Sequence, residues 1–533
     1  MTIAATHFKI RNHWLGIFGL VLFFAVLRWN SYDAPLIRDE GEYAYAAQLL
    51  VQGIAPYEHA FIQKPPMVIY SYALSNLLLP HVFWAPRLLA YLFVALATIL
   101  LGYIARLEFG KGFAWPAMWL VTPMILLPEI DQFKANTEMF LLLPLLATVA
   151  VYAQSRHRGQ KLKYWFAAGF LGATTLCYKY TALPMLAFVY VVWSIELWHG
   201  VRNVNLLGRS WLAAFAGAAV AAIIELGFFL VHDGGARLWE CTVEFNRYYA
   251  SSSNFGLAAF WSQMGIFWSG WWILFFLPLA VFLKPNPRRW FWIGIFICSL
   301  LATSASCNSQ YYIPMMPFWA LLCAVGIRAL ASRLTEWSAS TSKWIGCLIT
   351  IVVMLLLIRP DVPWLKCTRK RFVEVKMDGY PFQESQMVAA RVAQLSSLDD
   401  FVFVAGSEPE ILFYARRFSP TRFITVYSLM IPTPVALKYQ QEAIRDLQKR
   451  PPSLIVYVSS STSWERQETT PMDFFIFLKN FLKQNYSVIG GYVINGQKGH
   501  WSEPLTNGEF ANASLVLFKR NNTRLEYKIA TPH

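Results

Sequence analysis

The sequence predicts a polytopic α-helical membrane protein that ends in a smaller soluble α/β domain. Of the 533 residues, 56% are hydrophobic and only 14% are charged, whereas soluble domains carry about 25% charged residues. Apolar segments long enough to cross a bilayer recur up to residue 359 and then stop. Beyond residue 360, short apolar runs alternate with helix-like stretches, as in a compact α/β domain. We therefore expect a transmembrane domain at 1–359 and an extracytoplasmic α/β domain at 360–533.

The charge balance of the chain narrows its class further. Lys and Arg number 46 against 31 Asp and Glu, a formal charge of +15, and 16% of the residues are aromatic. This composition excludes a disordered chain, a coiled coil and a simple nucleic-acid-binding protein. The expected partner is therefore a membrane and not a nucleic acid.

The first apolar segment, Trp14–Trp29, follows Lys9 and Arg11 and is expected to be an uncleaved anchor. A cleaved signal peptide would begin in the same way but needs a small-x-small cleavage site, and this core runs into Arg28 instead. Ten further segments have the length and apolarity of a membrane span. They are 86–106, 112–128, 138–154, 163–178, 180–198, 211–231, 266–284, 289–305, 313–331 and 343–359.

The loops between these segments alternate in charge. Five of them are basic: Arg106–Lys111, Arg156–Lys163, His199–Arg209, Lys284–Arg289 and Arg328–Lys343. Lys and Arg in short loops collect on the cytoplasmic side, and a cytoplasmic N-terminus places all five loops there. The result is about eleven spans and an external C-terminal domain.

The segment Pro66–Leu79 is apolar but too short for a span, and its length is typical of an interfacial or re-entrant helix. Counting it as a crossing would also move the basic loops to the outside. We therefore interpret residues 30–85 as one large external loop that carries amphipathic helices. A helix from Asp39 to about Val51, ended by Gly53, is the first of them.

The C-terminal part shows four strand-like runs and two clear helix-like stretches. The runs are Phe401–Ala405, Ser453–Val458, Tyr486–Ile494 and Ser514–Phe518, and the helices Glu408–Arg417 and Pro434–Lys449. Asn521–His533 is expected to be a polar tail or a last edge strand.

The cysteine spacing and the absence of nucleotide-binding and zinc-protease motifs from the sequence exclude several classes of protein. None of the seven cysteines has a C-x-x-C spacing and none lies beyond Cys367, so the external domain is no disulfide scaffold. Pairing of Cys307 with Cys367 stays open. No Walker loop, strand-borne G-x-G-x-x-G or H-E-x-x-H occurs.

The spans themselves are nearly free of ionisable residues, which argues against a pump or a proton-coupled transporter. Glu225, in the span 211–231, is the main exception. Glu225 could be a functional carboxylate, or it could form a hydrogen bond between two helices.

The informative charges lie at the outer ends of the spans, and each allows two interpretations. Asp39 and Glu40 could simply be the acidic residues that stabilise the first turn of a helix. Alternatively, a carboxylate at this place could serve as a general base or hold the acceptor substrate. Lys64, before two prolines, suits a side chain that snorkels to the headgroups, or one that binds a phosphate. Glu138 suits a helix start or an active site.

Five short motifs follow one another along the chain: Asp39-Glu40-Gly41, Gly53 with Pro56-Tyr57, Lys64-Pro65-Pro66, Ala135-Asn136-Thr137-Glu138 and Gln310-Tyr311-Tyr312 with Pro317. In this order they resemble the motifs of bacterial GT-C glycosyltransferases of the protein-mannosyltransferase-like class (family 39), which includes the lipid A aminoarabinose transferases. The soluble part is similar more weakly, through Val404 to Glu410, Arg416-Arg417, Pro420-Thr421-Arg422 and Arg450-Pro451-Pro452.

The resemblance implies a GT-C fold and transfer of a sugar from a polyprenyl-phosphate donor to a lipid, glycan or protein hydroxyl. The reaction would take place at the outer face of a bacterial inner membrane, with the N-terminus cytoplasmic and the C-terminal domain periplasmic. The sugar and the acceptor stay open: a lipopolysaccharide sugar, lipid A, another surface glycan of the cell envelope and a protein hydroxyl all fit.

By residue matching, Asp39 resembles the essential first-loop aspartate and Glu138 the second acidic residue of the family. Lys64, Tyr311 or Tyr312, and more loosely Arg247, match residues that bind the donor phosphate. The remaining motif residues are assigned to substrate binding: Glu40, Tyr57, His59 and Gln310.

Three positions depart from the family pattern. Gln63 stands where the aminoarabinose transferases have an acidic metal ligand, Gln310 where many relatives have His, and Glu42 where part of the class has Arg. A bound zinc ion and aminoarabinose as the sugar are therefore not supported, and no cofactor is assigned, although a divalent metal stays possible.

The expected chemistry is a single displacement with inversion. Cationic side chains stabilise the charge that grows on the leaving phosphate, and Asp39 takes the proton of the acceptor hydroxyl. Two rivals remain: a transporter or flippase of lipid-linked glycans, and a membrane sensor or scaffold. One deep external pocket that joins Asp39, Lys64 and Glu138 would favour the enzyme.

Overall fold

The computed structural model describes most of the chain. The described residues are 18–80, 82–127, 133–232, 235–252, 256–283, 286–303, 308–334, 339–377, 379–495 and 498–521. The first part of the predicted anchor, Cys307 and the tail beyond Asn521 lie outside these ranges.

The chain packs as two compact units, which do not follow chain order. The helical unit comprises Met1–Ala34, Lys64–Leu238 and Ser253–Lys376. The sheet unit comprises Pro35–Gln63, Trp239–Ser252 and Met377–His533. The predicted division into 1–359 and 360–533 stays a prediction.

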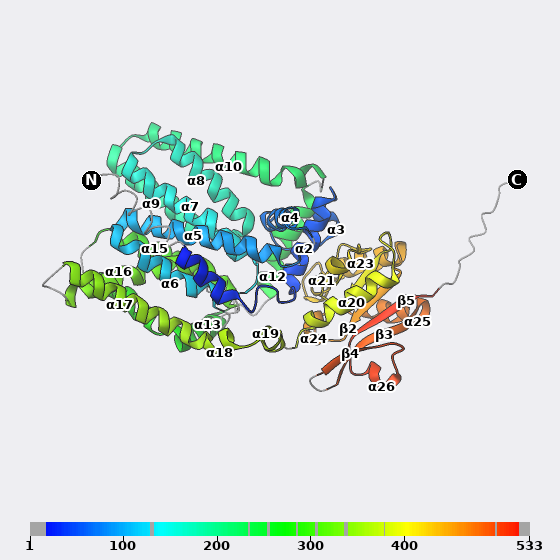
Figure 1. Cartoon of the computed structure of the whole chain (residues 1–533). Coiled ribbons are helices and arrows are strands. Elements are labelled where there is room, and N and C mark those ends of the chain that lie inside the picture. The colour runs from blue at the N-terminus through cyan, green and yellow to red at the C-terminus, as the bar shows by residue number, and fades with distance from the viewer. Residues whose placement is uncertain are drawn as a thin grey trace. The chain divides into compact units, whose positions relative to one another are not determined.

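The helical unit is built from helices and short helical turns that follow one another along the chain (Figure 1). They are α4 (Met67–Leu78), α5 (Ala85–Phe109), η1 (Lys111–Phe113), α6 (Ala114–Leu126), α7 (Thr137–Arg158), α8 (Leu162–Tyr178), η3 (Tyr180–Ala182), α9 (Leu183–Val201), α10 (Val204–His232), α11 (Ala236–Trp239), α13 (Leu257–Trp271), α14 (Ile273–Phe276), η5 (Leu277–Leu283), α15 (Arg289–Thr303), η6 (Ser309–Met315), α16 (Met316–Leu334), α17 (Ala339–Ile358), η7 (Arg359–Asp361), α18 (Val362–Lys366) and α19 (Arg369–Lys376).

Within the described residues, six helical segments are long and apolar enough to cross a membrane. A seventh candidate consists of α13 and the segment 273–283, bent by 103°. The predicted spans 112–128, 163–178 and 289–305 form α6, α8 and α15, which have 13, 17 and 15 residues. A straight span needs about 20 residues. The chain is thus a multi-pass membrane protein, and the predicted total of eleven spans stays a prediction.

Small residues bring the helices α8 and α10 close together. A Cβ atom at Gly169 would lie 1.9 Å from the carbonyl oxygen of Ala214, and one at Gly217 would lie 2.0 Å from that of Phe166. Only a hydrogen fits between the two backbones at these positions. Close approach through small residues is a common way for helices to associate in a membrane.

The basic loops gather at one end of the helical unit. Arg156 joins three of them, because its guanidinium lies 3.4 Å from Glu108 and 3.2 Å from Glu196. Arg288 lies 3.2 Å from Glu196 on its other side. Two more contacts complete the set: Arg333 donates to the carbonyl oxygen of Leu283 at 3.1 Å, and Arg328 lies over the ring of Phe113 at 5.8 Å.

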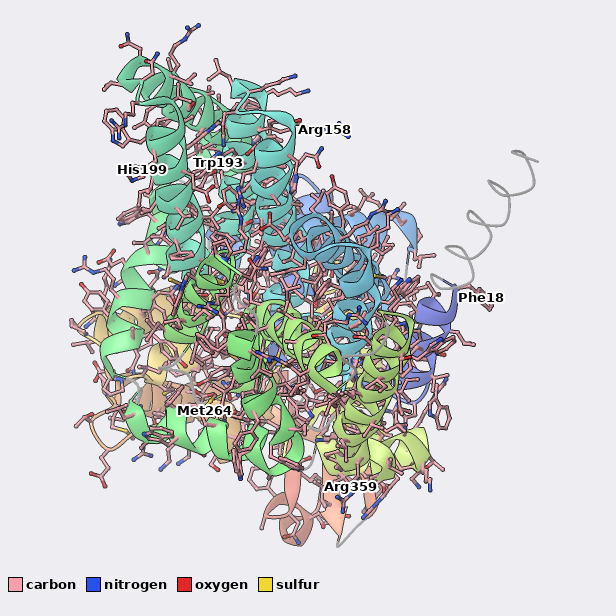
Figure 2. The ribbon with its side chains drawn as sticks, turned by 90° about the vertical axis from the view of Figure 1, so that its left-hand side faces the viewer. Phe18, Arg158, Trp193, His199, Met264 and Arg359 are labelled. Carbon is pink, nitrogen blue, oxygen red and sulfur yellow. The ribbon has the colours of Figure 1, made fainter. Side chains whose placement is uncertain are left out.

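All five loops that the charge pattern predicts on one side therefore share one end. Figure 2 shows Arg158 and His199 toward this end of the unit, and Met264 and Arg359 toward the opposite end. The alternation of basic and less basic loops along the sequence thus matches the alternating direction of the helices.

The sheet unit contains a five-stranded sheet in the order β1-β2-β5-β3-β4. Its strands are β1 (Val402–Ala405), β2 (Leu454–Val458), β3 (Tyr486–Asn495), β4 (Lys498–Ser502) and β5 (Ala513–Arg520). β1 and β2 are parallel, with Val404 opposite Val456, whereas the other neighbouring strands are antiparallel. The four predicted runs all form strands. The edge strand β4 was not predicted, because it contains no apolar run.

Helices accompany the sheet along the C-terminal chain. They are α20 (Phe382–Leu395), α21 (Glu410–Ala415), α22 (Tyr427–Met430), α23 (Ala436–Lys449), α24 (Ser461–Trp464), α25 (Asp473–Asn485) and α26 (Asn507–Phe510). β1 is buried along its whole length, which is typical of a strand covered on both faces.

Two segments from the external loops of the membrane part also belong to the sheet unit. The first carries α2 (Arg38–Val51) and α3 (Pro56–His59), and the second carries the π-helix η4 (Glu240–Glu244) and α12 (Phe245–Ser252). The helix predicted from Asp39 to Val51 is confirmed as α2.

Candidate functional site

Glu138 is the centre of a charged cluster in the helical unit. It lies in the first turn of α7 and only 2% of it is exposed. One carboxylate oxygen forms an ion pair with Lys179, and the other accepts a hydrogen bond of 3.0 Å from the hydroxyl of Thr137. Both oxygens of a buried carboxylate are thus satisfied, as its burial requires.

Lys179 follows the last residue of α8 and has a second partner besides Glu138. Its Nζ atom lies 3.6 Å from the centre of the Tyr311 ring, which η6 presents. A cation that close to an aromatic face is attracted by the ring quadrupole. Three elements far apart in the sequence, α7, α8 and η6, therefore meet around one ammonium group.

Lys64 adds a second positive charge to this cluster. Its side chain is partly buried, just before Pro65-Pro66 and α4. Among the charged groups that act on the Glu138 carboxylate, Lys179 has the largest effect and Lys64 the next. The two ammonium groups lie at the N-terminus of a 22-residue helix, an end of a helix that favours anions such as phosphate.

Hydrogen bonds hold the start of α7 against η6. The side-chain amide of Asn136 donates to Gln310 at 2.6 Å, and the hydroxyl of Tyr72 donates to the carbonyl oxygen of Ala135 at 3.0 Å. Tyr312 is fully buried, with its ring edge-on to Phe267 at 5.4 Å. Of the two adjacent tyrosines, Tyr311 is thus the one that lies against Lys179.

This cluster lies at the end of α7 opposite the basic loops. The 22 residues of α7, at about 1.5 Å per residue, span about 33 Å between Thr137 and Arg158. That length equals the hydrocarbon thickness of a bilayer. The cluster and the basic loops therefore lie on opposite sides of the membrane.

Asp39 lies in the sheet unit, near the N-terminus of α2, and its side chain is partly exposed. Burial, followed by the charges of Glu42 and Asp39, raises the pKa of the Tyr427 hydroxyl well above its usual value. Tyr249 of α12 acts on the same hydroxyl. Asp39, Glu42 and Tyr249 therefore each lie close enough to Tyr427 to act on its hydroxyl.

Three of the residues assigned to substrate binding lie on α2 and α3. Glu40 is fully buried, and its carboxylate accepts the backbone N–H of Ile37 at 3.4 Å, as a helix-capping residue does. Tyr57 is fully buried. His59 lies at the surface, and partial desolvation of its ring, followed by the charge of Arg450, lowers its pKa.

Arg247 is exposed on α12. The preceding residue, Asn246, donates from its side chain to the backbone oxygen of Gln63 at 2.8 Å. This bond ties α12 to the end of the first-loop segment.

A metal ion finds no obvious set of ligands here. Among the described residues, no group of three or more His, Cys, Asp or Glu side chains could hold one. Gln63 supplies an amide at the position where the resemblance implies an acidic metal ligand, and the Glu138 carboxylate is paired with Lys179. These residues therefore do not fit a metal ion.

The structure brings together four predicted residues in the helical unit: Lys64, Glu138, Gln310 and Tyr311. The others fall in the sheet unit or in the core: Asp39, Glu40, Tyr57, His59, Arg247 and Tyr312. A single pocket that joins Asp39, Lys64 and Glu138 stays a prediction, because these residues belong to different units.

Two residues of the site were missed at the sequence level, Lys179 and Tyr427. Lys179 carried a signal: it is a lone lysine between two apolar segments, in the loop that the charge pattern places outside. Tyr427 lies in a short apolar stretch of the C-terminal part, and nothing in the sequence sets it apart from core tyrosines.

Part of the chain matches a known protein family. Residues 63–225 match the family model described as dolichyl-phosphate-mannose-protein mannosyltransferase. The matched segment contains Lys64, Glu138 and Lys179. No curated protein is similar enough in sequence to match the chain.

Solved structures share the fold over nearly the whole chain. ArnT from Cupriavidus metallidurans bound to undecaprenyl phosphate is 15% identical, with a TM-score of 0.60 over 97% of this chain and 99% of that one. Its apo state gives a TM-score of 0.59 over 96% and 98%. The Archaeoglobus fulgidus oligosaccharyltransferase, tethered to an acceptor peptide, is 11% identical, with a TM-score of 0.54 over 94% and 75%.

The fold is therefore the one that these ArnT structures share. The predicted resemblance to the ArnT and protein-mannosyltransferase type is confirmed.

Proposed function

We propose that the protein is a membrane glycosyltransferase that moves a sugar from a polyprenyl-phosphate donor to a hydroxyl group of a lipid, glycan or protein. The observation that carries this proposal is the cluster of Lys64, Lys179, Glu138 and Tyr311. The match to a mannosyltransferase family model and the likeness to an ArnT structure that contains undecaprenyl phosphate support it.

The two lysines would bind the donor phosphate. As the bond between the anomeric carbon and the phosphate oxygen breaks, both electrons stay on the phosphate, whose negative charge grows. Lys64 and Lys179 stabilise this charge because they lie in a partly buried setting, where electrostatic attraction is stronger than in water. Glu138 holds the Lys179 ammonium in place, and the exposed Arg247 supplies a further cation.

Asp39 would take the proton of the acceptor. The acceptor oxygen forms its bond to the anomeric carbon while its proton passes to the Asp39 carboxylate. One displacement of this kind inverts the anomeric centre. No cofactor enters the scheme, because the bonds balance: the anomeric carbon–phosphate oxygen bond and the acceptor O–H bond break, while the anomeric carbon–acceptor oxygen bond and an O–H bond on Asp39 form.

The reaction would take place on the outer face of a bacterial inner membrane. The five basic loops share the end of the helical unit opposite the lysine cluster, and loops rich in Lys and Arg remain cytoplasmic. This orientation puts the N-terminus inside and the C-terminal domain in the periplasm.

The test begins in cells. A null strain should lack one surface glycan modification and accumulate a polyprenyl-phosphate sugar, measured by mass spectrometry of extracted lipids. That accumulated lipid then serves as the donor for the purified protein, with membranes of the null strain as acceptor. Movement of this lipid across the membrane of liposomes without sugar transfer would instead support the flippase. If the null strain changed neither the surface glycan nor the polyprenyl-phosphate sugar, both the transferase and the flippase would be contradicted.

A further inference from the structure

The side chain of Arg38 ties α2, which carries Asp39, to the C-terminal sheet. Its Nε donates to the carbonyl oxygen of Ser407 at 3.1 Å, and Nη2 donates to that of Thr462 at 2.7 Å. Nη1 forms an ion pair with Glu465. Ser407 follows β1, and Thr462 and Glu465 follow β2. One guanidinium thus joins the carboxyl ends of the two parallel strands to α2.

Further contacts hold the rest of α2. A Cβ atom at Gly41 would lie 2.6 Å from the backbone nitrogen of Glu410, so the helix touches the start of α21 at a position where only glycine fits. One turn later, the hydroxyl of Tyr45 accepts the backbone N–H of Ser419 at 3.0 Å. Arg38, Gly41 and Tyr45 therefore face the C-terminal chain, and Asp39 lies between the first two.

Two buried carboxyl groups lie under this contact. Glu408 and Glu410 are both fully buried. The hydroxyl of Ser463 accepts the backbone N–H of Ser407 and donates to Glu408, each at 2.7 Å. The charge of Arg38 acts on both carboxyl groups. Burying an ionised carboxyl group without a cation is costly, so Arg38 and Glu408 depend on each other.

A second arginine holds the segment that carries Arg247. The guanidinium of Arg422 lies 3.1 Å from Glu240 in η4 and 2.7 Å from Glu442 in α23. Its backbone oxygen accepts the N–H of Phe61 at 2.7 Å. Because η4 continues directly into α12, Arg422 fixes the helix on which Arg247 stands.

We propose that the C-terminal chain is the scaffold of the two external segments, with Arg38 as a positioning residue for Asp39 and Arg422 as a positioning residue for Arg247. This inference rests on the proposed function. It gives the two arginines different kinetic signatures, since Asp39 acts in the chemical step and Arg247 in holding the donor.

Steady-state kinetics with the donor lipid extracted from null cells tests this division. R38Q should lower kcat about tenfold and leave the donor KM unchanged, because a small displacement of a base costs that much. R422K should raise the donor KM about fivefold and change kcat little. R38K should recover part of the loss of R38Q.

Arg391 provides the matched control. It is a surface arginine of the sheet unit whose ion pair with Glu503 involves neither external segment, so R391Q should behave as wild type. Hydrogen exchange supplies a readout without turnover: R38Q should speed exchange in α2 and leave β2 and β5 protected.

Two outcomes separate the two proposals. If D39N is inactive while R38Q keeps the wild-type kcat and α2 exchange, the scaffold inference is overturned and the proposed function stands. If D39N transfers sugar normally, the assignment of Asp39 as the base is wrong, and with it the part of the proposed function on which the role of Arg38 rests. Should R38Q not fold, E465N decides, because asparagine tolerates the positive φ of +52° at this position; normal kcat and α2 exchange in E465N would overturn the inference.

Discussion

The ammonium of Lys179 lies 3.6 Å from the centre of the Tyr311 ring while it forms an ion pair with Glu138. The cation therefore has a fixed position before any ligand arrives. A phosphate that approaches it meets a donor whose conformational entropy has already been lost, which favours binding.

Removing the charge of Lys179 should separate stability from donor binding. K179M leaves the buried Glu138 without its ion-pair partner and should cost about 3–5 kcal/mol of stability. The double variant K179M/E138Q should regain most of the thermal stability but not the affinity for undecaprenyl phosphate. Thermal unfolding in detergent and a lipid-binding titration measure the two effects. Restored binding in the double variant would show that Lys179 only neutralises Glu138.

Lys64 should act on the donor. K64A is expected to raise the apparent KM for the polyprenyl-phosphate sugar at least tenfold, which corresponds to about 1.4 kcal/mol of lost binding. K64R, which keeps the charge, should lose less. Initial rates over a range of donor concentrations check this. An unchanged donor dependence in K64A would mean that the side chain merely snorkels to the headgroups.

Asp39 should be required for turnover and not for folding. D39N keeps the size of the side chain and loses only its ability to take a proton, so transfer should fall by at least 10² at an unchanged unfolding temperature. D33N is the matched control, because Asp33 forms an ion pair with Arg369 at 2.7 Å and has no assigned role. Near-normal product formation by D39N in membranes would refute the assignment.

Two glycines of α10 should respond differently to the same substitution. G217A forces a methyl group to 2.0 Å from the carbonyl oxygen of Phe166, whereas nothing lies within 4 Å of the Cβ position of Gly227. Overpacking of this kind costs about 1–3 kcal/mol. We expect G217A to unfold at a lower temperature than wild type and G227A to unfold at the wild-type temperature. Equal unfolding temperatures would mean that α8 and α10 do not pack this closely.

The buried carboxyl pair should make stability depend on pH. Burial and the neighbouring Glu408 raise the pKa of Glu410, and burial raises that of Glu408 against the opposing effects of Ser463 and Arg38. Because both folded-state pKa values lie above the unfolded value of about 4.3, their contribution is complete below that pH. It is lost as pH rises through the folded pKa values.

Hydrogen-bond geometry agrees with a protonated Glu410. The single hydroxyl proton of Ser385 has two neighbouring acceptors, the carbonyl oxygen of Pro381 at 2.8 Å and Glu410 at 2.6 Å. A proton on Glu410 allows both contacts to be hydrogen bonds. We expect the unfolding temperature to fall between pH 4 and pH 8 in wild type and to fall less in E410Q. An identical slope in E410Q would show that the pair is not the cause.

Much of the fold was accessible from sequence patterns because each pattern has a local cause. Long apolar segments must be helical in a membrane, since every backbone polar group needs a partner there, and the strand-like runs of the C-terminal part formed the sheet. The edge strand β4 was missed because Lys498–Ser502 pairs with β3 without an apolar pattern of its own. Strand pairing supplied what the local sequence lacked.

In the candidate site too, some residues were predictable from local sequence and others only from the tertiary structure. Lys64, Glu138 and Tyr311 were found because short motifs carry them, and the charge of the loops placed them opposite the basic end. Lys179 carried a sequence signal as a lone lysine between two apolar segments, but its pairing with Glu138 and Tyr311 could be recognised only in three dimensions, because these residues lie 41 and 132 positions away along the chain. Local composition thus determined that this is a multi-pass membrane protein with a C-terminal sheet and with its basic loops at one end of the helical unit. Which cation pairs with Glu138, and that α2 joins the sheet through Arg38, are decided by long-range packing, whose energies depend on contacts between distant segments.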